Sequence, residues 1–314
     1  MTHKDKPLIT IVGVSGKQGR SAARTLLQSG RYRVRGLTRR VDSPEALDLA
    51  KQGAELLSIP LDVGYKQAFV KAFRGSTGVF LMTPSIISPA THELELGKQL
   101  ADAAVEAGVQ QVIFSGLENV TEITADKKFA PHFTDKARIE EYIRTLPVTS
   151  SFIYMAFFYT NLMEFYPPAM KGDTLVFPIY LPKGFRAPFV DPLTATGPAI
   201  LEIFSNPEKY AGMSLPVIGD IISPQEMVDT FTRVTGKKAT YSPAFTREDL
   251  LHHFPDFGAN ELLVQEIMGM VGYVVEYGYF GKERDLLWSR QINPNSLSWE
   301  QFLRTTGWQG EKAK

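Results

Sequence analysis

The sequence contains no cysteine, no excess of charge and no long hydrophobic run, and each absence narrows what the protein can be. Without cysteine among its 314 residues, the chain can form no disulfide, no thiol nucleophile and no cysteine-ligated metal centre. Basic and acidic residues both number 34, and this zero net charge argues against a dedicated nucleic-acid-binding protein. No apolar run approaches the roughly 20 residues of a membrane-spanning helix. We therefore expect neither direct nucleic-acid contact nor membrane insertion.

The composition that remains is typical of a globular protein. Hydrophobic residues make up 44% of the chain and charged residues 22%, which suits a sizeable core. The length fits one large or two modest domains. Residues 1–6 are polar and do not resemble a signal peptide, so we expect a cytoplasmic protein, with the nucleus as a second compartment open to it.

A glycine-spaced loop lies near the N-terminus, between a short apolar strand expected over residues 9–12 and a helix-like segment over residues 20–27. Glycine allows the backbone to turn tightly and to approach a ligand, while the first N–H groups of a helix attract an anion. The pattern therefore predicts a site for the pyrophosphate of a dinucleotide. The loop consists of Gly13, Val14, Ser15, Gly16, Lys17, Gln18 and Gly19.

The end of the second expected strand, residues 32–38, indicates which dinucleotide this is. An acidic residue usually stands there when the cofactor has a free ribose 2′-hydroxyl. Here Arg39 and Arg40 follow the strand, and the first acid is Asp42. Such basic side chains are what a ribose 2′-phosphate requires. The alternative is that both arginines lie on a solvated surface turn and bind no ligand. We favour NADP(H) over NAD(H) as the ligand.

The first half of the chain alternates strands and helices. This alternation predicts a Rossmann-type α/β fold, a doubly wound parallel sheet with helices on both faces and ligands at the carboxyl ends of the strands. A helix is expected over residues 135–146. The expected strands lie at residues 9–12, 32–38, 54–58, 78–82, 111–115 and 149–154.

Beyond residue 155 the pattern becomes irregular. We expect a nucleotide-binding domain over residues 1–155 and a smaller mixed α/β C-terminal lobe over residues 156–314 that covers the cofactor crevice. A helix should begin in the aromatic stretch 157–162. Short strands are expected near residues 174–180 and 214–218, and helices near residues 191–204, 224–235, 261–271 and 297–304.

Five further sequence motifs accompany the glycine loop. They lie at residues 37–40 (LTRR), 114–119 (FSGLEN), 132–136 (HFTDK), 139–142 (IEEY) and 159–162 (YTNL). With these motifs the chain resembles the NmrA-like family of atypical short-chain dehydrogenases. The resemblance covers residues 8–165 and, more loosely, the rest through residues 206–210. Some members of this family are reductases or proposed oxidoreductases, many in fungal metabolic clusters. Others bind NADP(H) and act as redox sensors or transcriptional co-regulators.

The resemblance implies where NADP(H) would lie. The loop would hold the pyrophosphate, Arg39 the 2′-phosphate and Lys136 the nicotinamide ribose, with Thr83 along the nicotinamide half. The segment Phe158, Tyr159, Thr160 and Asn161 would pass near the nicotinamide. The chain departs from the family after the third strand, because members often carry Gly-Asp where this sequence has Ile59-Pro60. Asp62 is the nearest acid, and its role at the adenine end is open.

The catalytic residues are less regular than the cofactor site. Typical short-chain dehydrogenases use Tyr-x-x-x-Lys and a strand-end serine; here Ser115 and Lys136 fit, but His132 stands in the tyrosine position. Histidine titrates near neutrality and can donate a proton, although a neighbouring Lys⁺ disfavours a second positive charge. His132 could instead pack on its loop and bond the backbone. Tyr154 and Tyr159 are rival proton donors or ordinary core residues.

Two other groups have less specific patterns. Phe157, Phe158, Phe165 and Tyr166 could line an apolar substrate pocket or pack between the lobes. The adjacent residues His252 and His253 would point to different faces of a helix, so we expect no metal site there.

The sequence as a whole favours an NADP(H)-dependent oxidoreductase that moves a hydride to or from a small apolar carbonyl, alcohol or enone. Lys136 would position the cofactor, Ser115 would hold the substrate oxygen, and His132 or a tyrosine would handle the proton. The alternative is a non-catalytic NADP(H)-binding redox sensor or transcriptional co-regulator that acts through a regulatory protein partner.

Overall fold

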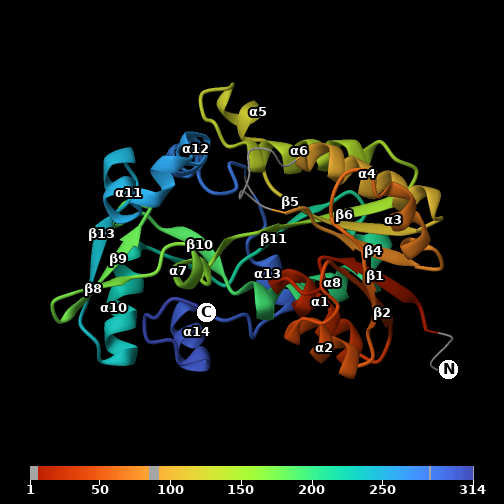
Figure 1. Ribbon diagram of the computed structural model, residues 1–314, viewed down its shortest axis with the longest axis horizontal. Helices are drawn as coiled ribbons and strands as arrows, with labels where there is room; N and C mark the ends of the chain where they lie inside the picture. Colours follow the sequence, from red (N-terminus) through yellow and green to blue (C-terminus); the bar gives the residue numbers. More distant parts are fainter. Residues whose placement is uncertain (1–5, 85–91, 283, 314) are drawn as a thin grey trace.

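A seven-stranded parallel sheet forms the centre of the larger half of the molecule, in a computed structural model that describes residues 6–84, 92–282 and 284–313 (Figure 1). Its strand order is β11-β6-β5-β4-β1-β2-β3. From β1 the chain adds β2 and β3 on one side of β1, and then places β4, β5 and β6 on the other side. The order of the strands therefore reverses between β1 and β4. The strands are β1 (Leu8–Val12), β2 (Arg33–Thr38), β3 (Glu55–Ser58), β4 (Gly78–Leu81), β5 (Gln111–Gly116), β6 (Thr149–Met155) and β11 (Ser214–Val217).

Helices cover both faces of this sheet. In Figure 1, α3, α4 and α6 lie above it, and α1, α2 and α8 lie below it. All residues of β1 and β5 are buried, as expected for strands covered on both faces. The expected Rossmann-type fold is therefore confirmed. The helices are α1 (Lys17–Gln28), α2 (Pro44–Lys51), α3 (Lys66–Phe73), α4 (Glu93–Glu106), α5 (Val120–Thr124), α6 (Pro131–Arg144) and α8 (Pro192–Ser205).

The strand expected near residues 214–218 belongs to this large sheet and not to the smaller lobe. Residues 214–217 pair in parallel with β6 and form one edge of the sheet. An edge position tolerates Pro216, because only one side of an edge strand has to donate ladder hydrogen bonds. Helix α8, also from the second half of the sequence, packs against α1 through Gly197, whose N–H donates to Ser21 Oγ at 2.9 Å. A domain boundary at residue 155 stays a prediction.

The smaller lobe is a mixed α/β structure, as expected, built on two three-stranded sheets. It lies to the left of the large sheet in Figure 1. Its strands are β7 (Phe157–Phe158), β8 (Ala169–Lys171), β9 (Thr174–Ile179), β10 (Ala187–Val190), β12 (Asp220–Ile222) and β13 (Ala239–Pro243). Its helices are α7 (Asn161–Glu164), α10 (Pro224–Thr235), α11 (Arg247–His253), α12 (Glu261–Tyr277) and α14 (Trp299–Thr306), with a 3₁₀ turn over Pro255–Ala259. The short helices α9 (Pro207–Tyr210) and α13 (Trp288–Ile292) instead contact α8 and the β6 and β11 strands of the large sheet.

The helix expected to begin within residues 157–162 is present as α7, which begins at Asn161. The aromatic pair at residues 157–158 precedes it as β7, because it finds a parallel partner in β10. Helix α12 runs six residues beyond its expected end and stops where Gly278 takes a positive φ of 83°. Within the described residues, no helix is long and apolar enough to cross a membrane.

Candidate functional site

The glycine loop is fixed to the carboxyl end of β2. Gly13 adopts a left-handed conformation with φ of 68°, which turns the chain out of β1. The Val14 N–H then donates to the Leu37 carbonyl at 3.0 Å, and the Ser15 and Thr38 hydroxyls are 2.9 Å apart. The loop is therefore a defined turn that is held from two sides.

The loop leads into an α1 N-terminus that is well suited to an anion. Gly16 is the N-cap and provides no side-chain acceptor, and the first turn contains no acidic residue. Gly19 is needed for the close packing of α1 on the loop, since a Cβ at this position would lie 2.7 Å from Val14 Cα. The first N–H groups of α1 thus keep their capacity to bind a phosphate oxygen.

Basic side chains lie at the end of β2, as the sequence predicts. Arg39 and Arg40 are both exposed, and the Arg39 backbone is held by a hydrogen bond from Ser58 Oγ to its carbonyl at 3.3 Å. The Arg39 guanidinium has no ion-pair or hydrogen-bond partner in the part of the chain that the structure describes. Asp62 is exposed and accepts a hydrogen bond from the next backbone N–H, that of Val63, at 2.8 Å, which accounts for this acid locally.

Lys136 and Thr83, both expected on the nicotinamide side, are in contact. The Lys136 ammonium donates to Thr83 Oγ1 at 3.0 Å, just beyond the carboxyl end of β4. Both groups also bond the carboxylate of Glu93, the first residue of α4. This ion pair is buried, with 9% of the Lys136 side chain and 3% of the Glu93 side chain exposed. Glu93 is a site residue that the sequence analysis missed.

His132 also bonds a carboxylate that the sequence analysis missed. Helix α6 begins at Pro131, four residues before its expected start, because proline suits the first position of a helix. His132 is therefore helical and lies one turn before Lys136 on the same face. Its Nδ1 lies 2.7 Å from Glu266 Oε1 on α12, and its backbone N–H donates to the same oxygen at 2.9 Å.

Ser115, at the end of β5, faces the glycine loop. Its hydroxyl donates to Gln18 Oε1 at 2.9 Å, and the residue is buried. Ser115 thus contacts the glycine loop directly. The strand β5 also pairs with β4, and the Lys136 ammonium bonds Thr83 just beyond the end of β4.

The segment from Phe158 to Asn161 runs from β7 to the start of α7. Tyr159 and Thr160 are buried, and Thr160 Oγ1 lacks a hydrogen-bond partner among the described residues. Glu164, at the end of α7, forms an ion pair with Lys17 of the glycine loop. The two sides of the crevice are therefore in direct contact at this point.

The two rival tyrosines are core residues. The Tyr154 hydroxyl donates to Glu140 Oε2 at 2.8 Å, and Tyr159 bonds the Leu297 carbonyl at 3.4 Å. Burial, with nearby carboxylates as a further cause, raises the pKa of both phenols well above the usual range. A phenol with a raised pKa is a poorer proton donor at neutral pH.

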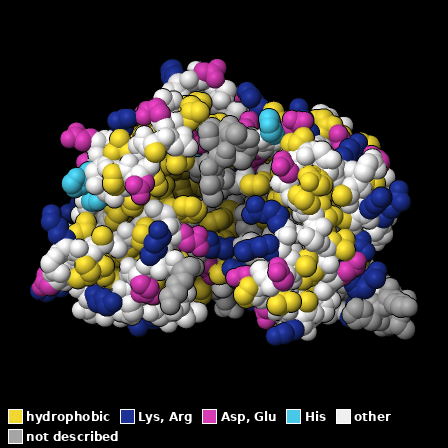
Figure 2. Space-filling view, in the orientation of Figure 1, with side chains coloured by type: hydrophobic (Ala, Val, Ile, Leu, Met, Phe, Trp, Pro, Cys, Tyr) yellow, Lys and Arg dark blue, Asp and Glu magenta, His cyan; other side chains and the backbone are white. Residues whose placement is uncertain are grey.

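The space between the two halves of the molecule is lined by hydrophobic side chains. Figure 2 shows a hollow there, with Lys and Arg side chains along its right rim. Packing explains two of the aromatic residues at 157–166. The Phe157 ring lies 4.5 Å from that of Tyr279, and the Tyr166 ring 4.6 Å from that of Tyr180, whereas Phe165 remains exposed.

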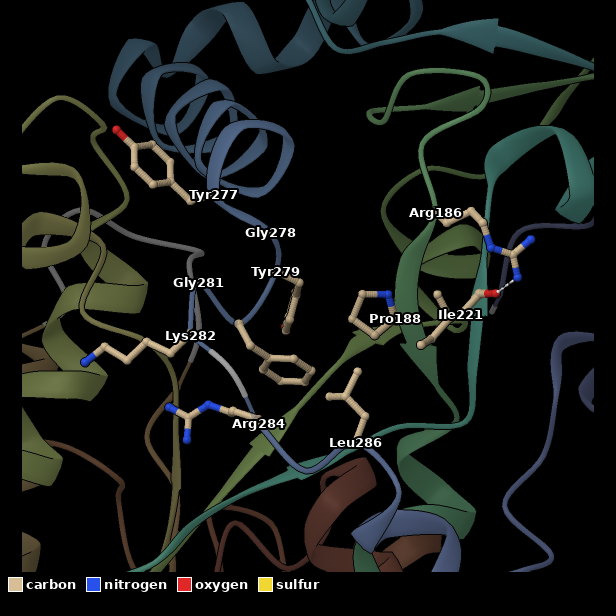
Figure 3. Close-up of a pocket in the computed structure, with 11 residues that line it drawn as sticks. Arg186, Pro188, Ile221, Tyr277, Gly278, Tyr279, Gly281, Lys282, Arg284 and Leu286 are labelled. Atoms are coloured by element: carbon tan, nitrogen blue, oxygen red, sulfur yellow. Dashed lines mark hydrogen bonds between the residues drawn. The ribbon is translucent and has the colours of Figure 1, made fainter.

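A separate cavity of about 560 Å³ lies beside the C-terminal end of α12 (Figure 3). Tyr277 and Tyr279 lie on one side of it, and Pro188 and Ile221, from the paired strands β10 and β12, lie on the other. Its basic side chains are in part already paired, Arg186 with Glu226 and Arg284 with Glu118.

Comparison with known proteins adds to this geometry. The model of the NmrA-like family matches residues 5–303. The chain is 33% identical over 292 residues to the NmrA-like family domain-containing oxidoreductase hkm9 of Aspergillus hancockii, with 88% of this chain and 85% of that protein covered.

Solved structures show the same fold. NmrA, a negative transcriptional regulator solved in complex with NADP, superposes with a TM-score of 0.81 at 22% identity, covering 95% of this chain and 94% of that one. The triphenylmethane reductase of Citrobacter sp., complexed with NADP(H), gives 0.72 at 15% identity, covering 95% and 99%. Because the family model spans nearly the whole sequence, the chain belongs to the NmrA-like family.

Proposed function

We propose that this protein is an NADP(H)-dependent oxidoreductase that acts on a carbonyl, an alcohol or a conjugated double bond of a small, largely apolar molecule. The observation that carries the proposal is the row of groups along one edge of the sheet. It begins with the exposed Arg39 after β2, continues through the glycine loop after β1, and ends with Lys136 and Thr83 after β4. The oxidoreductase name of the relative hkm9 supports the proposal.

The residues present fit the cofactor. The left-handed Gly13 and the N-terminus of α1, which has no side-chain cap, suit the pyrophosphate. The exposed Arg39 suits a 2′-phosphate, since a guanidinium binds phosphate oxygens in pairs. Thr160 Oγ1, buried and without a partner among the described residues, suits a polar group of the bound ligand. When bound, the nicotinamide supplies or accepts the hydride.

The chain's own residues would position the substrate and move the proton. Ser115, which donates to Gln18 from the end of β5, can turn its hydroxyl toward a substrate oxygen, because a serine hydroxyl rotates freely about its C–O bond. Lys136 holds the ribose side, and its positive charge is balanced by Glu93. His132 handles the proton, since both rival tyrosines are committed to the core.

The apolar character of the substrate rests on the aromatic residues behind the site. Tyr279 packs on both Phe133 and Phe157, with ring separations of 5.9 and 4.5 Å. The cavity beside α12 shares Tyr279 with this cluster, and its volume of about 560 Å³ is in the range of small-molecule sites.

Titration calorimetry with NADP⁺, NADPH and NAD⁺ tests the cofactor part of the proposal. Wild type, Arg39→Ala and the control Arg31→Ala should be compared, since Arg31 is also exposed but precedes β2 instead of following it. We expect Arg39→Ala to weaken NADP⁺ binding about 10- to 150-fold, the equivalent of one charged hydrogen bond of about 1.5–3 kcal/mol, and to leave NAD⁺ binding unchanged. Equal losses for both variants would contradict the assignment of Arg39.

Turnover is tested by following NADPH absorbance with a panel of ketones, aldehydes, enones and quinones. Oxidation of NADPH by at least one class of compound is expected. If wild type binds NADPH but oxidises it with no member of the panel, the oxidoreductase function is wrong. A strong preference for one redox form of the cofactor would then favour the redox sensor.

A further inference from the structure

We propose that Glu266 is a positioning residue for His132. It holds the imidazole proton on Nδ1, so that Nε2 is the atom through which a proton passes to or from the substrate oxygen. The inference rests on the proposed function and adds the residue that prepares its acid–base group.

The contacts of Glu266 determine both the place and the tautomer of the imidazole. One carboxylate oxygen accepts from the His132 backbone N–H at 2.9 Å and lies 2.7 Å from Nδ1. An ionised carboxylate can only accept hydrogen bonds, so the nitrogen facing it must carry a proton. Only 7% of the His132 side chain and 9% of the Glu266 side chain are exposed, so little water competes for this bond.

The second ring nitrogen is left for the substrate. In the described part of the chain His132 Nε2 makes no hydrogen bond. The ring packs edge-on against Phe133, with centroids 4.7 Å apart, which further limits its rotation. His132 and Lys136 occupy one face of α6, one turn apart, and the Lys136 ammonium reaches Thr83 at the carboxyl edge of the sheet. The imidazole therefore belongs to the same side of α6 as the proposed cofactor site.

The two basic side chains on this face of α6 each have their own carboxylate. From the sequence alone, the positive charge of Lys136 is expected to disfavour a second positive charge on His132. In the structure Lys136 forms a buried ion pair with Glu93, and Glu266 provides a separate negative charge for the ring. Two carboxylates thus match two potential cations, which satisfies the requirement that buried charges be paired.

The proposed proton step is simple. As hydride from NADPH reduces the substrate carbonyl, the Nε2–H bond breaks and a new O–H bond forms on the developing alkoxide. The imidazole is left neutral with its proton on Nδ1, and it regains a proton from solvent after product release. In the direction of alcohol oxidation, the neutral Nε2 accepts the hydroxyl proton.

The packing of α12 explains how an acid from the smaller lobe reaches α6. Glu266 is the single charged residue in the sequence between residues 262 and 275, within an otherwise mainly apolar run. Gly269, one turn later, lets α12 lie directly on the chain that leads into α6, since a Cβ there would lie 2.8 Å from the Phe129 nitrogen. A buried carboxylate in such a helix is costly unless it is hydrogen-bonded, and His132 supplies both bonds.

Glu266→Gln distinguishes positioning from a merely structural role. Glutamine removes the negative charge. In the wild type one oxygen faces both the His132 backbone N–H and Nδ1, and the neutral amide oxygen in its place is a weaker acceptor that holds the Nδ1–H tautomer less strongly. Glu276→Gln is the matched control, because Glu276 lies on the same helix and pairs with Lys128 with 53% of its side chain exposed. Both variants should bind NADP⁺ as wild type does.

Two readouts are needed. Long-range ¹H–¹⁵N spectra of the NADP⁺ complex report the tautomer of each of the five histidines, and His132→Gln identifies the signal of His132. We expect the Nδ1–H tautomer in wild type and Glu276→Gln, and a shift toward Nε2–H in Glu266→Gln. With a substrate found in the NADPH panel, kcat of Glu266→Gln should fall at least about tenfold with KM little changed, a part of the roughly 10²–10⁴-fold that acid–base catalysis contributes. Glu266→Asp should recover part of kcat.

The inference is overturned by an Nε2–H tautomer of His132 in wild type, or by a kcat of Glu266→Gln equal to that of an active wild type. The wild-type tautomer and the kinetics of His132→Gln decide the matter even if Glu266→Gln is unstable, since wild-type kcat in His132→Gln would also overturn it. A wild type that oxidises no NADPH instead refutes the proposed function, and with it the proton step.

Discussion

Replacing Gly19 with alanine tests whether the glycine loop binds the cofactor through its exact shape. Gly19 lies in the first turn of α1, and a Cβ there would contact the Gly13 carbonyl oxygen and come within 2.7 Å of Val14 Cα. Ordinary contacts of a Cβ begin at 3.4 Å. The obstacle is backbone, so no side chain can rotate away, and either the loop or the helix start has to move.

The expected effect on stability is small because two contributions oppose each other. Overpacking costs about 1–3 kcal/mol. Alanine gains about 1 kcal/mol over glycine in a helix. The net loss is about 0–2 kcal/mol, and at about 2–4 °C per kcal/mol the melting temperature should fall by less than about 8 °C.

Cofactor binding should suffer far more. If the displaced loop loses one N–H bond to a phosphate oxygen, the cost is about 1.5–3 kcal/mol, or about 10- to 150-fold in Kd. Calorimetric titration with NADP⁺ and a thermal melt of the same sample measure the two effects together. Gly184→Ala is the matched control, because a Cβ at Gly184 meets nothing within 4 Å. If Gly19→Ala binds NADP⁺ like wild type, the loop is not the pyrophosphate site.

Three further predictions concern packing and buried charge. Arg284→Met breaks the buried ion pair with Glu118 and should lower the free energy of unfolding by about 3–5 kcal/mol in denaturant titrations, whereas Arg284→Met/Glu118→Gln should recover much of it. Gly197→Ala, whose Cβ would lie 2.7 Å from Thr25 Cβ, should lower the melting temperature by separating α8 from α1; an unchanged melt would contradict this packing argument. Burial and the nearby Glu93 raise the pKa of Asp135 above the usual value of an aspartate. The folded state is thus penalised where this carboxylate is ionised, so Asp135→Asn should be more stable than wild type near neutral pH. This gain in stability should shrink as pH falls through the raised pKa of the folded state and vanish below the pKa of the unfolded state. A gain that grows toward acidic pH would contradict a raised pKa.

The larger half of the fold could be predicted from the sequence because strands and helices alternate regularly in it. Each of the six strands expected before residue 155 is present within one residue at either end. The apolar runs of β1, β4 and β5 are buried on both faces, and a serine cap followed by proline marks the start of α2. The edge strand β11 was assigned to the wrong sheet because four residues carry no information about which of two open edges they will join.

The site was predicted only in part for a different reason. The glycine loop and Arg39 form local patterns, whereas the partners of the catalytic candidates depend on the tertiary structure. Glu93 is 43 residues from Lys136, and Glu266 is 134 residues from His132. One signal was available, since a single acid in the apolar run 262–275 requires a buried partner.

These carboxylates change how the crevice has to be interpreted. Lys17 pairs with Glu164, Lys136 with Glu93 and His132 with Glu266, so these three basic groups of the proposed site each have their own acid, whereas Arg39 remains exposed. Two of the three acids, Glu164 and Glu266, come from beyond residue 155. The first 155 residues alone contain the loop, the His-x-x-x-Lys pair and Glu93, but they lack the acids that pair with Lys17 and His132. On our proposal, the acid–base chemistry of this protein therefore depends on an acid from beyond residue 155, Glu266 of α12.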